Sequence, residues 1–299
     1  MMYYLVYGLL FIFSLLPNFI LYGIGDFVAF LLYHVFTYRK EVVMENLAIA
    51  FPEKSLSEKK AIARKFYRNL VESFMETIIF LSASERRLEK MFQGNLNILN
   101  ELAGHVSKIQ LHTLHQFNWE VLNLAAAPRL RRDFLVVYMP IVNKVVERLF
   151  IKLRTRFGTK LISAHHFRRD FQKYQNEGYV LALVADQSPG SAKHAYWLNF
   201  FGKPTPFVTG PEKSALFNKT AVVFAEMIRI KRGVYSASYE VLTENADGYP
   251  KGEITWRYVR FCEEAIRRAP DNYLWSHRRW KHQYKAAYTN NALELLEED

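Results

Sequence analysis

The middle of the chain alternates between two hydrophobic patterns. Short apolar runs typical of strands cover residues 108–114, 134–138, 160–163, 179–185, 221–229 and 234–242. Helical spacing of apolar residues covers 119–126, 145–157, 168–176, 213–218 and 253–268. Strands that alternate with helices of this length predict an α/β fold, in which a mostly parallel central sheet is flanked by helices on both faces. The last two strands are expected to pair with each other.

A long amphipathic helix is predicted before this region. Apolar residues recur at intervals of three and four positions from Ile62 to Leu81, which is the period of one helix face. Ser57 is the expected N-terminal cap of this helix.

The first part of the chain is almost wholly apolar and aromatic from Tyr3 to Phe36, with a break at Pro17-Asn18. It lacks the charged start and small-residue cleavage site of a secretory signal. Arg39-Lys40 follow it, as expected of a cytoplasmic flank. We therefore predict a membrane-anchoring segment over residues 1–38, as a single span or a bent hairpin, before one globular domain over residues 39–299. The alternative is a buried helix pair. The acidic tail Leu293 to Asp299 is expected to fray.

The charge balance narrows the class of partner. The 40 Lys and Arg residues exceed the 29 Asp and Glu residues, giving a formal net charge of +11. Such a balance suits anionic membrane lipids, a phosphorylated substrate or an acidic carrier protein. The chain lacks the signatures of nucleic-acid-binding proteins, so no nucleic-acid partner is expected. The single Cys262 excludes an internal disulfide and a cysteine-based zinc site.

The first candidate for chemistry is the spacing of His115 and Glu120. On one continuous helix, residues five apart point about 140° away from each other, since each residue turns roughly 100°. Here a predicted strand ends before His115 and a predicted helix begins after Asn118, so the chain turns between them and the two side chains can meet. A neutral imidazole held by a carboxylate can take a proton from a hydroxyl. The plainer interpretation is a core histidine and a helix-start glutamate.

Asp186 follows another predicted strand and is expected on the same rim of the sheet as His115, because ligands of parallel sheets bind beyond the carboxyl ends of the strands. Asn118 is the expected cap of the helix that begins at Trp119, which puts Glu120 in its first turn. His112 is a rival base, but its place inside the strand pattern favours a structural role.

Three other segments carry polar or aromatic clusters. The first is a basic cluster, which either forms a solvated helix face or supplies an arginine to a phosphate or oxyanion; it consists of Lys152, Arg154 and Arg156. The run 197–206 either lines an apolar groove or covers the edge of the sheet. The run 274–281 interleaves basic and aromatic residues, as membrane interfaces and nucleic-acid sites both do.

These blocks resemble the late lauroyl and myristoyl acyltransferases of lipid A biosynthesis, within the superfamily of glycerolipid acyltransferases that share a histidine and an acid separated by four residues. The resemblance runs from about Arg39 onward. The matching blocks are Glu45-Asn46-Leu47 with Phe51-Pro52-Glu53, His115 to Glu120, Arg154 with Phe157-Gly158, Asp186-Gln187, Phe200-Phe201-Gly202 and residues 273–281. The chain departs from the family at Met139, where many members carry arginine, and at Gln116-Phe117, which replaces an aromatic-glycine pair.

The resemblance implies acyl transfer from acyl carrier protein to a hydroxyl of a lipid A precursor. His115 would be the base, Glu120 would hold its imidazole, Arg154 would bind negative charge and Asp186 would support the site. Direct attack on the thioester requires neither a metal nor a cofactor, with acyl carrier protein thioester as co-substrate. The implied partners are the carrier protein, a phosphorylated glycolipid and anionic lipids at the cytoplasmic face of the inner membrane.

Three alternatives stay open at this point. The first is an acyltransferase with another lipid acceptor, such as a lysophospholipid, an aminolipid or a glycolipid. The second is a thioesterase-like hydrolase in which His115 activates water. The third is a non-catalytic membrane-binding protein that retains the fold.

Overall fold

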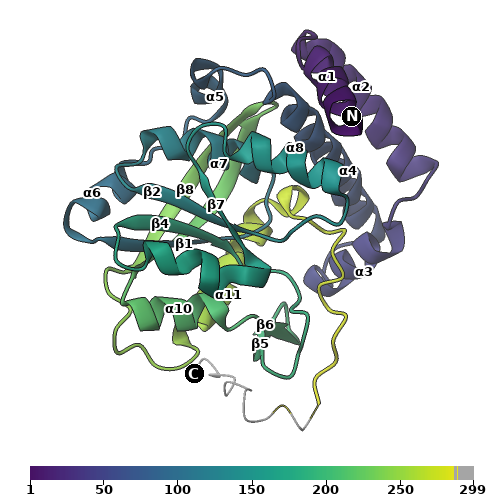
Figure 1. Ribbon diagram of the computed structural model, residues 1–299. Coiled ribbons are helices and arrows are strands. Elements are labelled where there is room, and N and C mark those ends of the chain that lie inside the picture. Colours follow the sequence, from purple (N-terminus) through teal and green to yellow (C-terminus); the bar gives the residue numbers. More distant parts are fainter. Residues whose placement is uncertain (286–287, 289–299) are drawn as a thin grey trace.

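A computed structural model describes residues 1–285 and residue 288 (Figure 1). Its centre is a six-stranded sheet with the strand order β3-β2-β4-β1-β7-β8. The strands are β1 (Lys108–Thr113), β2 (Asp133–Tyr138), β3 (Lys160–Ser163), β4 (Tyr179–Val184), β7 (Ala221–Lys231) and β8 (Val234–Thr243). All neighbours are parallel except β7 and β8, which form an antiparallel edge. The predicted α/β fold with a mostly parallel sheet is confirmed.

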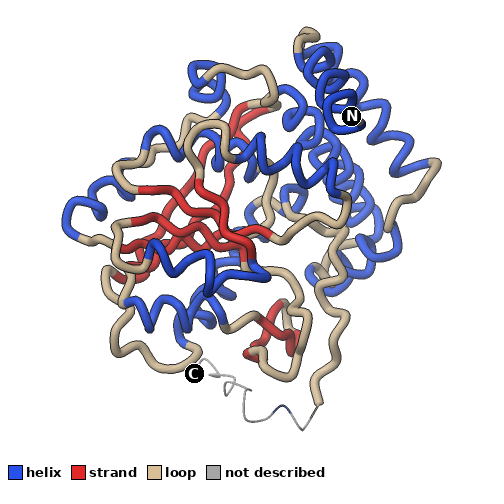
Figure 2. Tube along the Cα trace, in the orientation of Figure 1, coloured by secondary structure: helices blue, strands red, loops and turns tan. Residues whose placement is uncertain are grey.

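Helices cover both faces of the sheet, as Figure 2 shows. One face carries α5 (Glu85–Met91), α6 (Asn97–His105), α7 (Trp119–Ala126) and α8 (Lys144–Arg154), and the other carries α9 (Phe167–Phe171), α10 (Gly210–Asn218) and α11 (Glu253–Arg268). Side chains alternate along β1: Ile109 and Leu111 pack under the first group, while Gln110 and His112 face α10 and α11. Both faces are buried, which is why β4 is wholly apolar and β2 nearly so.

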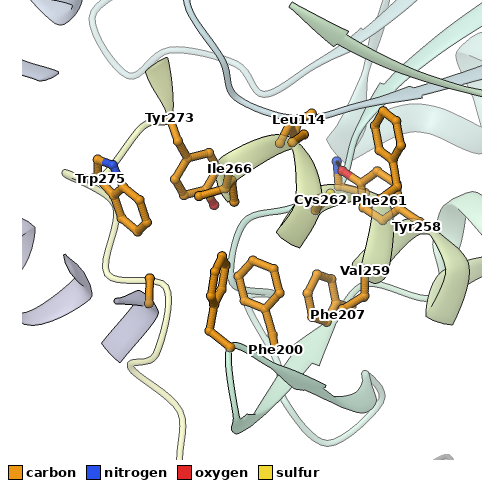
Figure 3. Close-up of a cluster of buried hydrophobic side chains, with 14 of the residues drawn as sticks. Leu114, Phe200, Phe207, Tyr258, Val259, Phe261, Cys262, Ile266, Tyr273 and Trp275 are labelled. Atoms are coloured by element: carbon orange, nitrogen blue, oxygen red, sulfur yellow. Dashed lines mark hydrogen bonds between the residues drawn. The ribbon is translucent and has the colours of Figure 1, made fainter. Parts of the chain in front are cut away.

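A two-stranded hairpin, β5 (Tyr196–Phe200) and β6 (Lys203–Phe207), extends the core beyond α11. Its two-residue turn consists of Phe201 (φ 52°) and Gly202 (φ 73°), the left-handed pair that a type I′ hairpin turn requires. Figure 3 shows Phe200 and Phe207 of this hairpin packed in the cluster around Cys262 of α11. The hairpin was not predicted, although the run 197–206 contains it.

The chain begins with the helices α1 (Met2–Ser14), α2 (Asn18–His34), α3 (Lys40–Ala50) and α4 (Leu56–Ile79). Within the described residues, no individual helix has both the length and the apolar character to cross a membrane. Taken together, α1 and α2 meet that requirement, but they are bent by 113° at the break between them. Figure 1 shows this pair at one corner of the molecule, beside α4.

Several predicted boundaries were wrong for identifiable reasons. The cap of α4 is Ser55 and not Ser57, because Ser55 and Glu58 form a reciprocal capping box. The helix predicted over 168–176 is only α9, followed by the 3-10 turn Gln172–Tyr174. The predicted helix 145–157 ends at Arg154. The tail from Leu293 to Asp299 lies outside the described residues.

Candidate active site

Two neighbouring strands place His115 and Asp186 side by side. In the parallel pairing of β1 with β4, Thr113 is the register partner of Val184. His115 and Asp186 each follow that pair by two residues, so both side chains emerge at the same point of the rim. Their predicted placement on the same rim is confirmed, and the structure adds a direct hydrogen bond between them that was not predicted.

The contact joins His115 Nδ1 to Asp186 Oδ1 at 2.7 Å. The Asp186 side chain is 1% exposed and that of His115 is 22% exposed, so the carboxylate is buried behind a ring that reaches the surface. Burial alone would raise the pKa of Asp186, but the charge and hydrogen bonds of His115 bring it below its ordinary value. An ionised carboxylate can only accept, so Nδ1 carries the proton and Nε2 is left as the basic nitrogen.

Glu120 has a different partner from the one expected. Its two carboxylate oxygens each accept a hydrogen bond from Arg154 Nε at 3.0 Å, and Arg154 Nη2 also donates to Glu120. Trp119 Nε1 donates to the same carboxylate at 3.1 Å. The expectation that Glu120 holds the His115 imidazole is therefore replaced: Asp186 fills that position. The physical reason is that α7 turns Glu120 towards the last turn of α8, where Arg154 lies.

Asn118 caps α7 as predicted. Its side-chain oxygen accepts a hydrogen bond from the Glu120 backbone N–H at 2.9 Å. Asn118 is buried, and the Phe117–Asn118 peptide bond is cis. The ring of Trp119, the first residue of the helix, lies edge-on to the His115 ring with centroids 5.4 Å apart. The start of α7 therefore contacts the imidazole through the Trp119 ring.

His112 is enclosed in the core. It is almost fully buried, its Nε2 lies 2.9 Å from the Gln110 side-chain amide, and its ring packs against Phe224 and Tyr258. Burial lowers the pKa of His112 to about 3, so the ring is neutral at physiological pH. These contacts are those of a structural histidine, consistent with the sequence interpretation.

A pocket of about 420 Å³ opens beside Trp119. It lies between α4 and the N-terminal helices on one side and α7 and α8 on the other. Its lining is mostly apolar, with the Glu120–Arg154 pair on one wall; the residues are Leu32, Tyr38, Leu70, Ser73, Phe74, Thr77, Asn118, Trp119, Glu120, Ile141, Phe150, Arg154, Leu274 and Ser276. An apolar pocket with a few polar groups is the usual form of a small-molecule site.

Backbone hydrogen bonds join the active-site turn to residues 272–274, at the start of the closing block of the sequence. Leu274 N–H donates to the carbonyl of His115 at 3.0 Å, and Phe117 N–H donates to the carbonyl of Asn272 at 3.0 Å. Asn46 of the early block donates from Nδ2 to the carbonyls of Trp275 (2.7 Å) and His277 (2.8 Å). Three blocks that are far apart in sequence thus meet around the histidine.

The remaining sequence clusters have structural partners. Lys152 lies 3.9 Å from the centre of the Tyr7 ring of α1, and Arg156 donates to the carbonyl of Phe80 at 2.6 Å. Of the three basic residues considered together, only Arg154 lines the pocket. The hairpin containing 197–206 packs on α11 and on Trp280, so it covers this helix, whereas the sequence predicts a cover for the edge of the sheet or the lining of an apolar groove.

Sequence reasoning missed the α4 wall of the pocket, formed by Leu70, Ser73, Phe74 and Thr77. The predicted apolar stripe of this helix included Phe74, which is 52% exposed and faces the pocket mouth. The sequence feature that could have revealed this wall is the pair Ser73 and Thr77, two small polar residues one turn apart beside the apolar stripe. Small side chains on a packed helix leave room for a ligand.

The site is thus a histidine hydrogen-bonded to a buried carboxylate, at the rim of an α/β sheet and beside an apolar pocket. The sequence model of the family described as "bacterial lipid A biosynthesis acyltransferase" matches residues 1–282. The chain therefore belongs to this family, and it is an acyltransferase. The match also covers the N-terminal helices, which the resemblance noted from the sequence did not include.

Two curated relatives agree with this assignment. The chain is 22% identical over 281 residues to the lipid A biosynthesis palmitoleoyltransferase of Escherichia coli K12, covering 92% of this chain and 89% of the relative. It matches the lipid A biosynthesis acyltransferase of Shigella flexneri with the same identity and coverage.

Proposed function

We propose that this acyltransferase moves a fatty acyl chain from an acyl-carrier-protein thioester to a hydroxyl of a lipid A precursor in outer-membrane lipopolysaccharide biosynthesis. The observation that carries the proposal is the His115–Asp186 pair beside an apolar pocket of about 420 Å³, in a chain of the lipid A acyltransferase family.

His115 is the catalytic base. Its Nε2 takes the proton of the acceptor hydroxyl while the hydroxyl oxygen attacks the thioester carbonyl carbon. The carbon–sulfur bond then breaks, and the proton held by the imidazolium passes to the departing thiolate. Asp186 stabilises the imidazolium during this exchange because its buried carboxylate lies 2.7 Å from Nδ1.

The pocket is the candidate site for the acyl chain, since its walls are mostly apolar and it begins at Trp119, which contacts the His115 ring. Arg154 is the candidate for binding a phosphate or a developing oxyanion. Its bonds to Glu120 use Nε and Nη2, so the N–H groups of Nη1 can serve a ligand. Asn118 lines the same pocket, and we assign it a supporting role there.

The partners follow from charge and exposure. A net charge of +11 supports binding of an acidic carrier protein, a phosphorylated glycolipid and anionic lipids. The α1–α2 pair exposes aromatic side chains, including Phe19, Phe27 and Phe30. We therefore propose that residues 1–38 anchor the enzyme at the cytoplasmic face of the inner membrane and that residues 39–299 carry the acyltransferase activity.

The test is acyl transfer by the purified protein from acyl carrier protein thioester to a lipid A precursor. His115→Ala should abolish transfer, whereas His105→Ala, an exposed histidine paired with Glu244, should leave it intact. Rapid release of fatty acid without acceptor would indicate a hydrolase instead. Mass spectrometry of lipids from cells that lack the protein should show lipid A missing one acyl chain; an unchanged lipid A and a missing phospholipid would indicate another acceptor.

A further inference from the structure

A buried carboxylate outside the reacting pair lies directly behind the active-site turn. Glu76 of α4 is fully buried. Its Oε2 accepts hydrogen bonds from Asn118 Nδ2 and from the Tyr235 hydroxyl, each at 2.9 Å, and its Oε1 accepts one from the Tyr22 hydroxyl at 3.1 Å. A carboxylate is costly to bury unless its oxygens are hydrogen-bonded. Glu76 thus joins three elements that are far apart in sequence.

The bond to Asn118 orients that residue towards the pocket. The two ends of the Asn118 amide have different partners: Nδ2 donates to Glu76, and Oδ1 accepts from the Glu120 backbone N–H at 2.9 Å. Because Glu76 presents an acceptor, the amide nitrogen must face it, and the oxygen is left for the helix start. Glu120 is then held where it pairs with Arg154, and all three of these residues line the pocket.

The same carboxylate ties α2 to the body of the molecule. Tyr22 lies against the turn between β7 and β8, where a Cβ at Gly233 would be 2.5 Å from its hydroxyl. One turn before Glu76, Glu72 pairs with Arg229 and Arg232. Arg232 also pairs with Asp26 of α2. A polar cluster therefore holds α2 against the rest of the molecule, and it reaches the active-site turn through the bond from Asn118 to Glu76.

We propose that Glu76 is a positioning residue for acyl transfer, which holds the Asn118 amide in the orientation that caps α7 and so keeps Glu120 and Arg154 on the pocket wall. Through Tyr22, the seating of α2 depends on the same carboxylate. The inference rests on the proposed function, since its main measurement is acyl transfer.

The protonation of Glu76 gives a further measurable consequence. Burial raises the pKa of Glu76 to about 7, against the lowering effect of the hydrogen bond from Asn118. The titratable and charged groups around Glu76 are Tyr22, Glu72, Tyr235, Arg229 and Arg232. A carboxyl protonated on Oε1 can still accept from Asn118 through Oε2, while its O–H donates to the Tyr22 oxygen. Protonation of Glu76 is therefore expected to preserve the positioning, as Glu76→Gln should.

The test compares kcat for five variants of the full-length protein with that of the wild type. Glu76→Ala should lower kcat by about 10²-fold, the order expected when reacting groups are misplaced by about 1 Å. Glu76→Gln should recover most of that loss, because its amide oxygen can accept from Asn118 and its nitrogen can donate to Tyr22. It should also leave the pH profile of kcat near pH 7 like that of the wild type, since glutamine makes the bonds that protonated Glu76 can make.

A charge swap separates positioning from general stability. Asn118→Asp places a second carboxylate next to Glu76 and should lower kcat. Adding Glu76→Gln should restore activity, because the amide N–H of the glutamine can then donate to the carboxylate at position 118. Both substitutions are isosteric, so neither changes the volume of the packed site. Glu226→Gln is the control, since Glu226 is another buried carboxylate with an ion pair, to Arg268; its kcat should be unchanged.

Two results would overturn the inference: wild-type kcat in folded Glu76→Ala, or a double variant no more active than Asn118→Asp alone. The proposed function fails separately, if the His115→Ala protein retains acyl transfer. Inactive His115→Ala together with fully active Glu76→Ala would leave the function in place and remove only the role of Glu76.

Discussion

His115 and Asp186 meet at 2.7 Å because each follows its own strand by two residues beyond the paired positions Thr113 and Val184. The contact is thus fixed by the register of two central parallel strands and not by a flexible loop. The pair presents Nε2 of His115 outwards and leaves the carboxylate buried. This places the His115 ring at the rim, next to the Trp119 side of the pocket.

The first prediction concerns this pair. Asp186→Asn removes the negative charge that stabilises the imidazolium and that selects the Nδ1–H tautomer. We expect kcat to fall by about 10²–10⁴-fold with little change in folding. The measurement is steady-state acyl transfer, with Asp247→Asn as control because Asp247 forms an exposed ion pair with Lys219. Wild-type kcat in Asp186→Asn would show that the carboxylate does not assist the base.

The sequence allowed the rim residues to be predicted, but not the partner of Glu120. Apolar runs reveal where strands end, so His115 and Asp186 could be placed together without tertiary information. The direction of Glu120 depends on where α8 packs, and Arg154 is 34 residues away in the chain. Periodicity also could not reveal the α4 wall of the pocket, because that wall exists only once α4 lies across α7 and α8.

The second prediction separates the stability of the Glu120–Arg154 pair from its function. The Glu120 side chain is 5% exposed, so Arg154→Met leaves a buried carboxylate without its partner, and we expect a loss of about 3–5 kcal/mol in the free energy of unfolding. Adding Glu120→Leu should recover much of this stability but no acyl transfer. Urea unfolding and kcat measured on the same samples test this. A double variant that regains activity would mean that the pair is only structural.

The third prediction tests the pocket as the acyl-chain site. Ser73→Leu fills space on the α4 wall, so we expect preference to shift towards shorter acyl chains, with about 0.8 kcal/mol of binding lost for each methylene excluded. The measurement is kcat/KM over a series of acyl chain lengths. Ser57→Leu, on the exposed first turn of α4, serves as the control. An unchanged length preference in Ser73→Leu would place the chain elsewhere.

The fourth prediction concerns stability in acid. Burial lowers the pKa of His112 to about 3, whereas in the unfolded chain it titrates near its ordinary value of 6.5. Below that value the unfolded state binds a proton that the folded state does not, so stability falls as the pH falls. Between pH 7.5 and pH 5 the contribution of His112 to this loss is about 2 kcal/mol. Urea unfolding should show a smaller loss in His112→Leu; equal losses would contradict this.

The fifth prediction tests the membrane surface. Phe27 and Phe30 of α2 are 63% and 54% exposed, and an aromatic ring gains free energy by leaving water for the lipid interface, which an aspartate does not. Phe27→Asp and Phe30→Asp should therefore reduce cosedimentation with vesicles that contain anionic lipid. The matched control is Phe217→Asp on α10, which is 78% exposed and lies at the opposite end of the molecule in Figure 1.

Salt separates the two contributions to this binding. The net charge of +11 adds an electrostatic attraction that weakens as salt shortens the Debye length from about 10 Å at 0.1 M. Binding by the wild type should fall with salt to an apolar remainder, and that remainder should be missing in the two α2 variants but kept in Phe217→Asp. If Phe217→Asp loses vesicle binding and the α2 variants keep it, the membrane surface lies at α10 and the anchoring role of residues 1–38 is wrong.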